Sequence, residues 1–223
     1  MRTYAQGRQL ASKWLKTRAL RVHPEIAAHI PSSRLYRPSR LKTMAGQFHS
    51  VVLKPVRGTG GWGLMKVSRS NGRYHWSYNT RRKSFRTYSQ LLRAVNRVRR
   101  GRSYLIQQGI DLATVNGRPI DYRVKHVKMG GRWRIRAMVG RVARRGLFVT
   151  NLCRGGRLLS AAEGLRQSLP GQETGKKATM RHLTRVSTGV LESRYPGIGQ
   201  LGFDYGIDRN GHIWMLEVNT RPH

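Results

Sequence analysis

Acidic residues are scarce in this chain of 223 residues, which has nine Asp and Glu against 44 Lys and Arg. Cysteine occurs once, at Cys153, which excludes an internal disulfide framework and a cysteine-rich metal site. No apolar run reaches the ~18–20 residues of a membrane-spanning helix, and the first residues contain no apolar signal core. These absences predict a soluble, cytoplasmic protein that has no membrane partner.

The remaining charge is strongly positive, at +35 by formal count, and arginine supplies 34 of the 44 basic residues. Such a field attracts nucleic acid, anionic polymers, acidic peptides and phosphorylated ligands alike. The segment Arg81–Arg102, with eight arginines and Lys83, is the candidate for nonspecific polyanion binding. A solvated arginine-rich surface without a partner is the alternative, and both interpretations remain open.

Apolar spacing predicts an α+β protein in which antiparallel strands alternate with a few helices. Asn71-Gly72 predicts a two-residue hairpin turn between two of the strands. The predicted helices span residues 6–20, 89–100 and 176–194. The predicted strands span residues 50–55, 64–68, 73–78, 104–110, 120–127, 132–139, 202–207 and 213–218.

Lys54 lies at the end of a predicted strand and precedes a loop with four glycines, Gly58 to Gly63. Glycines expose backbone N–H groups and allow phosphates to approach closely. The loop is not a Walker A motif, because the lysine precedes the glycines. The pattern indicates a phosphate site, and the alternative, which the pattern alone slightly favours, is an ordinary glycine-rich hairpin beside a surface lysine.

The C-terminal hairpin carries Asp204, Glu217 and Asn219. Strand alternation puts Glu217 and Asn219 on one face, and hairpin pairing can bring Asp204 opposite them. Two carboxylates and an amide oxygen suit Mg²⁺ or Mn²⁺ bound to nucleotide phosphates. The competing interpretation is that Asp204 caps a turn and Glu217 pairs with an arginine.

Several motifs, taken in order, resemble those of the ATP-grasp superfamily, and most closely its YheC/YheD-type endospore coat-associated proteins. The resemblance covers roughly residues 24–222 and includes the Pro31-Ser32-Ser33-Arg34 segment. The motifs are Val51-Val52-Leu53-Lys54-Pro55, Gly58-Thr59-Gly60-Gly61-Trp62-Gly63, Tyr104-Leu105-Ile106-Gln107-Gln108-Gly109, Asp121-Tyr122-Arg123, Val149-Thr150-Asn151 with Gly155-Gly156, Gly202-Phe203-Asp204 and Leu216-Glu217-Val218-Asn219-Thr220-Arg221-Pro222.

The resemblance implies an ATP-grasp fold whose two lobes, each an antiparallel sheet with helices, clasp a nucleotide. We expect an N-terminal helix and connector over 1–45, a first lobe over 46–105 and a second lobe over 106–223. About fifty residues precede Lys54, so we expect no full N-terminal pre-ATP-grasp domain.

The same resemblance implies roles for individual residues. Lys54 would contact the α- and β-phosphates, and the loop Gly58, Thr59, Gly60, Gly61, Trp62 and Gly63 would fold over the phosphates. Gln107, Gln108 and Ile110 would line the adenine pocket, with Asp111 near the ribose. Arg123 and Arg141 would lie near the transferred phosphate, Asn151 on the substrate side, and Asp204, Glu217 and Asn219 on the metal.

The implied activity is an ATP- and Mg²⁺-dependent carboxylate–amine ligase that acts through an acylphosphate. Its partners would be a carboxylate and an amine, with an anionic peptide or polymer as a substrate that suits Arg221. One alternative is a non-catalytic, spore-associated coat or polyanion-binding protein that keeps the fold. A nucleic-acid-binding module is another, although the sequence contains no RNP, zinc-finger or helix-turn-helix signature.

Overall fold

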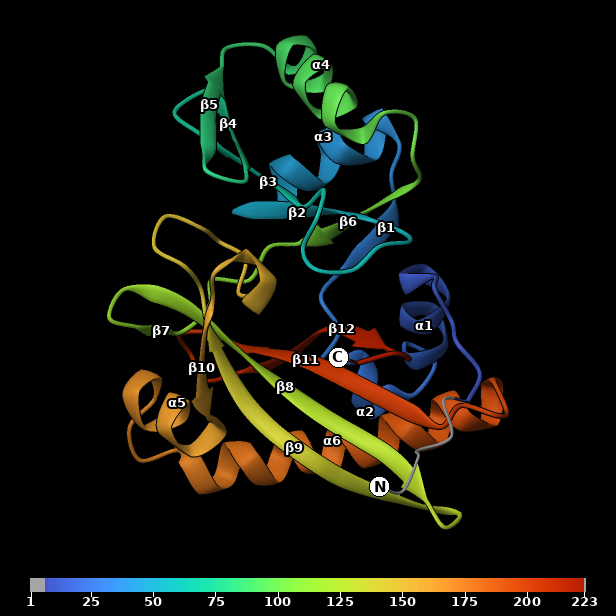
Figure 1. Ribbon diagram of the computed structural model, residues 1–223. Helices are drawn as coiled ribbons and strands as arrows, with labels where there is room; N and C mark the ends of the chain where they lie inside the picture. Colours follow the sequence, from blue (N-terminus) through green and yellow to red (C-terminus); the bar gives the residue numbers. More distant parts are fainter. Residues whose placement is uncertain (1–6, 223) are drawn as a thin grey trace.

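The computed structural model describes residues 7–222, which form two lobes stacked one above the other (Figure 1). Each lobe is an antiparallel sheet covered by helices, as the sequence predicts. None of the helices within these residues is long and apolar enough to cross a membrane.

The first lobe has a six-stranded sheet in the order β1-β6-β2-β3-β4-β5. Leu53, Met65, Leu91 and Ile106 are fully buried between this sheet and its helices. The strands are β1 (Ser33–Leu35), β2 (Ser50–Pro55), β3 (Met65–Ser70), β4 (Arg73–Tyr78), β5 (Arg81–Phe85) and β6 (Tyr104–Gln108), and the helices are α3 (Pro38–Gln47) and α4 (Tyr88–Arg99).

Local sequence signals account for the turns of this lobe. Asn71 and Gly72 both have positive φ, at 49° and 71°, and they join β3 to β4 as the hairpin motif predicts. Thr87 and Gln90 form a capping box that begins α4, and Arg100 in the left-handed region ends it.

The second lobe has a sheet in the order β10-β9-β8-β11-β12, with β7 paired to β8. The long helix α6 and the shorter α5 cover one face, and α1 packs against α6 and β12 (Figure 1). The strands are β7 (Thr114–Val115), β8 (Arg118–Met129), β9 (Arg132–Val142), β10 (Arg157–Ser160), β11 (Gln200–Ile207) and β12 (Ile213–Asn219). The helices are α1 (Lys13–Leu20), α2 (Pro24–Ala27), α5 (Ala161–Ser168), α6 (Glu173–Arg194) and the 3₁₀ turn Leu152–Arg154.

The N-terminal helix is shorter than the predicted span of 6–20, whose first residue lies outside the described range. Gly7 bridges to Ile198, and the backbone N–H of Leu10 donates to Thr220 Oγ1 at 2.8 Å, so this segment is extended along the second lobe. Ser12 then caps α1 by accepting from the Leu15 N–H at 3.3 Å. Residues 7–12 therefore form an extended segment that packs against the second lobe, and they are not part of the helix.

Tertiary pairing assigns the connector to both lobes. β1 pairs with β6 and α3 packs on β2, β3 and β6, so residues 33–47 join the first lobe, whereas α1 and α2 join the second. Helices α2, α3 and α5 and strands β1, β5, β7 and β10 lie outside the elements predicted from sequence.

A buried polar seam joins α6 to the second sheet. Tyr205 Oη and Thr184 Oγ1 are 3.0 Å apart, and His126 Nδ1 lies 2.8 Å from Thr188 Oγ1. His126 is only 3% exposed, and burial lowers its pKa from 6.5 to about 4, with the charge of Arg185 acting in the same direction. The imidazole is therefore neutral in the folded protein at neutral pH.

Because the unfolded chain protonates His126 below its ordinary pKa, this residue should destabilise the fold as the pH falls from 6.5 towards 4. We expect the free energy of unfolding to drop by roughly 2 kcal/mol between pH 7 and pH 5 from this group. Urea titrations at pH 7 and pH 5 measure this change in the free energy of unfolding. His126→Gln should remove that part of the fall, whereas His182→Gln, at an exposed histidine, should not. Identical pH profiles for wild type and His126→Gln would contradict the assignment.

Candidate functional site

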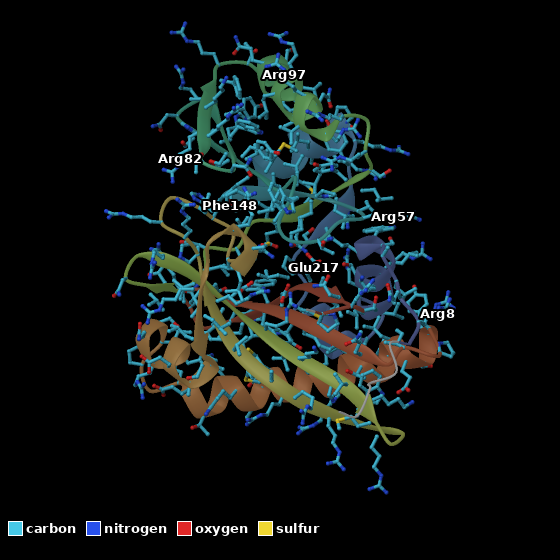
Figure 2. The ribbon with its side chains drawn as sticks, in the orientation of Figure 1. Arg8, Arg57, Arg82, Arg97, Phe148 and Glu217 are labelled. Carbon is cyan, nitrogen blue, oxygen red and sulfur yellow. The ribbon has the colours of Figure 1, made fainter. Side chains whose placement is uncertain are left out.

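A cavity of about 780 Å³ lies between the lobes, and both lobes contribute to its lining. Figure 2 shows Glu217 and Phe148, two of the lining residues, in the region between the lobes. Sixteen of the seventeen candidate residues line it: Lys54, Gly58, Thr59, Gly60, Gly61, Trp62, Gln107, Gln108, Ile110, Asp111, Arg123, Arg141, Asn151, Asp204, Glu217 and Asn219. Gly63 is not in the lining, and its carbonyl instead accepts a hydrogen bond from Tyr104 Oη at 3.0 Å.

A β-bulge in β12 positions the two carboxylates. Asp204 is paired directly with Glu217, as expected for the hairpin, but Tyr205 is paired with Met215, so Leu216 is the extra residue. The extra residue lets Leu216, Glu217 and Asn219 all line the cavity, while Met215 and Val218 stay in the core. The bulge thus aims Glu217 into the cavity beside Asp204.

Four charged side chains form a continuous row of ion pairs across β9, β8 and β11. Arg141 donates to Asp121 through Nε at 2.8 Å and Nη2 at 2.5 Å, and Nη2 also reaches Asp204 Oδ1 at 2.9 Å. Arg123 holds Asp204 from the other side, with Nη2 at 3.0 Å from Oδ2. The strand register dictates these contacts, because Asp121 is paired with Arg141 and Asp204 with Arg123.

The two aspartates respond differently to this environment. Burial alone would raise the pKa of Asp204, but Arg141 and Arg123 outweigh it and hold the pKa below its ordinary value. For Asp121, burial raises the pKa in spite of the Arg141 guanidinium and a hydrogen bond with Thr150, and the charge of Asp204 acts in the same direction as burial. Asp204 therefore stays ionised more firmly than Asp121, and the Arg141 guanidinium stays charged because both carboxylates raise its pKa.

Two buried lysines, one from each lobe, approach the Glu217 side. Lys54 Nζ donates to the bulged Leu216 carbonyl at 3.1 Å, and burial lowers the pKa of Lys54 while Glu217 opposes that shift. Lys13 Nζ lies 3.3 Å from Glu217 Oε1 and also donates to the Gly58 carbonyl. Lys13 therefore links the second lobe to the glycine loop.

The glycine loop of the first lobe contacts the turn that follows β9 in the second. Cys153 Sγ lies 3.3 Å from the Gly60 carbonyl, and the Arg154 guanidinium lies 4.2 Å from the centre of the Trp62 ring. Gly61 has φ +72°, and a Cβ there would lie only 2.5 Å from Asn151 Oδ1. A side chain at Gly61 would thus separate the two segments, which explains the requirement for glycine.

The lining carries seven Lys and Arg and four Asp and Glu, an excess of three positive charges. That balance suits an anionic ligand such as a triphosphate. For a divalent cation, no cluster of three His, Cys, Asp or Glu exists within residues 7–222. The hard oxygen donors at the cavity that would suit such a cation are those of Glu217, Asn219 and Asp204.

Sequence reasoning missed Lys13, Leu216 and Arg209 among the lining residues. Lys13 and Lys16 are one helical turn apart and share the buried face of α1 with Leu20. In the sequence, the only indication for Lys13 is that it and Lys16 have the spacing of residues on one buried helix face. Arg209 forms an exposed ion pair with Asp111 at 3.1 Å, which no local pattern indicates.

The two clasping lobes and this cavity define an ATP-grasp protein. The chain belongs to the YheC/D-like ATP-grasp family, whose family model matches residues 3–223. It is 32% identical to the endospore coat-associated protein YheD of Bacillus subtilis (strain 168) over 219 residues, which cover 95% of this chain and 48% of YheD. It is 26% identical to YheC of the same organism over 225 residues, 97% of this chain and 61% of YheC. The chain thus spans about half of YheD and three-fifths of YheC.

Solved structures agree on the fold. D-alanyl-alanine synthetase A from Vibrio cholerae matches with a TM-score of 0.57 and 16% identity, over 95% of this chain and 55% of that one. D-cycloserine synthetase DcsG matches with a TM-score of 0.59 and 10% identity, over 96% of this chain and 63% of that one. An N5-carboxyaminoimidazole synthase from Aspergillus clavatus, in complex with ADP, matches with a TM-score of 0.57 and 12% identity, over 96% of this chain and 45% of that one. These likenesses confirm the predicted fold.

The glycine loop should exchange its amide hydrogens quickly in the free protein and slowly with nucleotide. The Trp62 ring is 58% exposed, and the backbone hydrogen bond from Trp62 N–H to Thr59 O within the loop is long, at 3.4 Å. Hydrogen-exchange mass spectrometry over residues 57–64 with and without ATP and Mg²⁺ tests this. The β8–β9 turn at Gly130-Gly131, remote from the cavity, serves as the control. Equal exchange in both states would argue against a phosphate-covering role.

Proposed function

We propose that this protein is an ATP- and Mg²⁺-dependent carboxylate–amine ligase that forms a peptide-type bond through an acylphosphate. The observation that carries the proposal is the row of ion pairs Asp121–Arg141–Asp204–Arg123, in which Asp204 lies beside Glu217. Lys54 and Lys13 face this row in the same cavity. A pocket that only bound anions would not require buried carboxylates among its cations. The named neighbours D-alanyl-alanine synthetase and D-cycloserine synthetase support a ligase of this general kind.

The first lobe, the segment that leads from β6 into the second lobe, and Lys13 of the second lobe bind the nucleotide. Lys54 and Lys13 contact the phosphates, and the loop Gly58 to Trp62 covers them with its backbone N–H groups. Gln107, Gln108 and Ile110 lie where β6 leads into the second lobe and line the adenine side of the cavity. Asp111, beside Arg209, lies next in the chain and contacts the ribose.

Glu217 and Asn219 would hold Mg²⁺ together with Asp204. Glu217 is bound in the structure only by Lys13 among the described residues, whereas both oxygens of Asp204 are bound by arginines. Asp204 would be the third donor, and Arg123 is the more exposed of the two arginines that bind it. When bound, the cation neutralises charge on the phosphates.

Arg123, Arg141 and Asn151 serve the transferred group and the acyl substrate. A substrate carboxylate oxygen attacks the γ-phosphorus and ADP leaves, and an amine nitrogen then attacks the acyl carbon and phosphate leaves. Fixed guanidinium groups stabilise the charge of both steps without reorganising, because Arg141 is already held by two carboxylates. The cations Arg209 and Arg221 at the cavity lining favour an anionic acyl substrate, such as an acidic peptide.

The alternative function is a non-catalytic coat or polyanion-binding protein, and the names of the curated relatives favour association with the spore. The two functions differ at Glu217 and Asn219, because a ligase needs these oxygen donors beside Asp204 in the cavity, whereas binding a polyanion does not require them. We therefore place the ligase first and propose spore association as its location.

Glu217→Gln separates the two functions. The change keeps the side-chain volume and removes one carboxylate, so phosphoryl transfer should slow by ~10²-fold or more while the fold persists. ADP formation with pooled amino acids or acidic peptides as substrates, together with thermal melting, measures both. Glu173→Gln, at the start of α6, is the matched control with the same charge change. A folded Glu217→Gln protein with wild-type turnover would show that Glu217 is a structural ion-pair partner.

Lys13→Gln tests the residue that sequence reasoning missed. Losing a buried cation that faces the phosphates should weaken ATP binding by roughly 10- to 100-fold, on the scale of one hydrogen bond to a charged group. Calorimetric titration with ATP and Mg²⁺ gives the dissociation constants. Arg18→Gln removes the same charge from the exposed side of α1 and should change the affinity by less than about twofold. Equal affinities for both variants would remove Lys13 from the site.

A further inference from the structure

The first lobe contains no carboxylate. No Asp or Glu occurs between Glu25 and Asp111, whereas residues 33–108 contain eighteen Lys and Arg. Charge within this lobe is therefore not neutralised by the lobe itself. In the second lobe, by contrast, a buried arginine such as Arg141 forms an ion pair with an aspartate of the same lobe.

Eight of these cations surround one groove. It lies between β4, β5 and α4, has a volume of about 1060 Å³ and shares no lining residue with the cavity between the lobes. Within the described residues no ion pair joins a groove cation to a carboxylate. The eight are Arg73, Arg81, Lys83, Arg86, Arg93, Arg97, Arg100 and Arg102.

The helix side of the groove is one regular stripe. Gln90, Arg93, Ala94, Arg97 and Val98 line it, at the spacing of a single helix face. Figure 2 shows Arg97 on α4 at the top of the molecule, away from Glu217. Basic residues on β5 also protect an exposed sheet edge from pairing with other chains. That explanation does not extend to Arg93 and Arg97, which lie on a helix.

The groove also has an aromatic part. Trp76, Tyr78 and Phe85 line it, and the latter two are partly exposed. Trp76 is 5% exposed, and its indole N–H has no hydrogen-bond partner. Aromatic faces among arginines are the combination that binds unstacked bases together with their phosphates.

We propose that this groove binds single-stranded nucleic acid. The arginines bind the phosphates, for which their planar, multidentate donors are better suited than lysine. Tyr78 and Phe85 stack on bases, which a duplex keeps inside its own stack. An acidic polypeptide matches the charge but offers no ring to stack, and an aromatic face repels carboxylates. The aromatic lining therefore selects a single strand over both competitors.

The test measures binding of a fluorescent oligo-dT of about 20 nucleotides by anisotropy over a range of salt. Contacts to four to six phosphates should give a log–log salt slope of roughly −3 to −4. Oligo-dT should bind more tightly than an abasic strand of equal length, a duplex of equal length or poly-glutamate. Equal or tighter binding of any of these three competitors, or no binding at low salt, would overturn the proposal.

Two triple variants with the same charge change locate the site. Arg86→Gln, Arg93→Gln and Arg97→Gln together remove three groove cations and should weaken oligo-dT binding roughly 10- to 100-fold and flatten the slope by about 2. Arg132→Gln, Arg134→Gln and Arg181→Gln remove three exposed cations of the second lobe and should weaken it by less than about threefold. Melting temperature and ATP affinity should match wild type in both. Equal losses in the two triples would show that the overall charge, not the groove, binds the strand.

Discussion

The row of ion pairs on the second sheet is the constraint on which the site depends. Two arginines and two aspartates are removed from water together, and desolvation of each would be costly without its neighbours. Strand register supplies the neighbours, because Asp121–Arg141 and Arg123–Asp204 are directly paired residues. A slip of one residue in β8 would move both of its charges to the face covered by α5 and α6. The requirement to keep the row intact therefore fixes the sheet register and places Asp204 beside Glu217.

The bulge in β12 completes this arrangement with local geometry alone. Regular alternation would let Leu216 or Glu217 face the cavity, but not both. With Leu216 as the extra residue, its carbonyl receives Lys54 and the next side chain is the carboxylate held by Lys13. One irregular residue thus brings a lysine from each lobe to the same strand.

Sequence patterns predicted those parts of the molecule whose signals are local. The Asn71-Gly72 turn and the Asp204–Glu217 pairing are both confirmed, because each depends on neighbours across one hairpin. Helix α3 and strand β5 were missed because tertiary contacts decide them: β5 reads Arg-Arg-Lys-Ser-Phe, with no apolar alternation. Lys13 was missed for the same reason, since a lysine on a helix normally faces water and only docking against the second lobe buries it. The roles of the cavity residues stay predictions, since fold similarity does not establish them.

The uneven distribution of acids leaves an excess of positive charge in the cavity between the lobes. Eighteen cations and no acid leave the first lobe with a formal charge of +18, and the other residues carry +17. Salt screens most of the resulting repulsion beyond ~10 Å, so what persists acts where the lobes meet across the cavity. There Asp204 and Glu217 already have cationic partners, and the lining retains an excess of positive charge. An anionic ligand between the lobes is the one component that both attract. The charge balance of the cavity therefore favours an anionic ligand between the lobes, because the protein supplies too few carboxylates of its own to neutralise its cations.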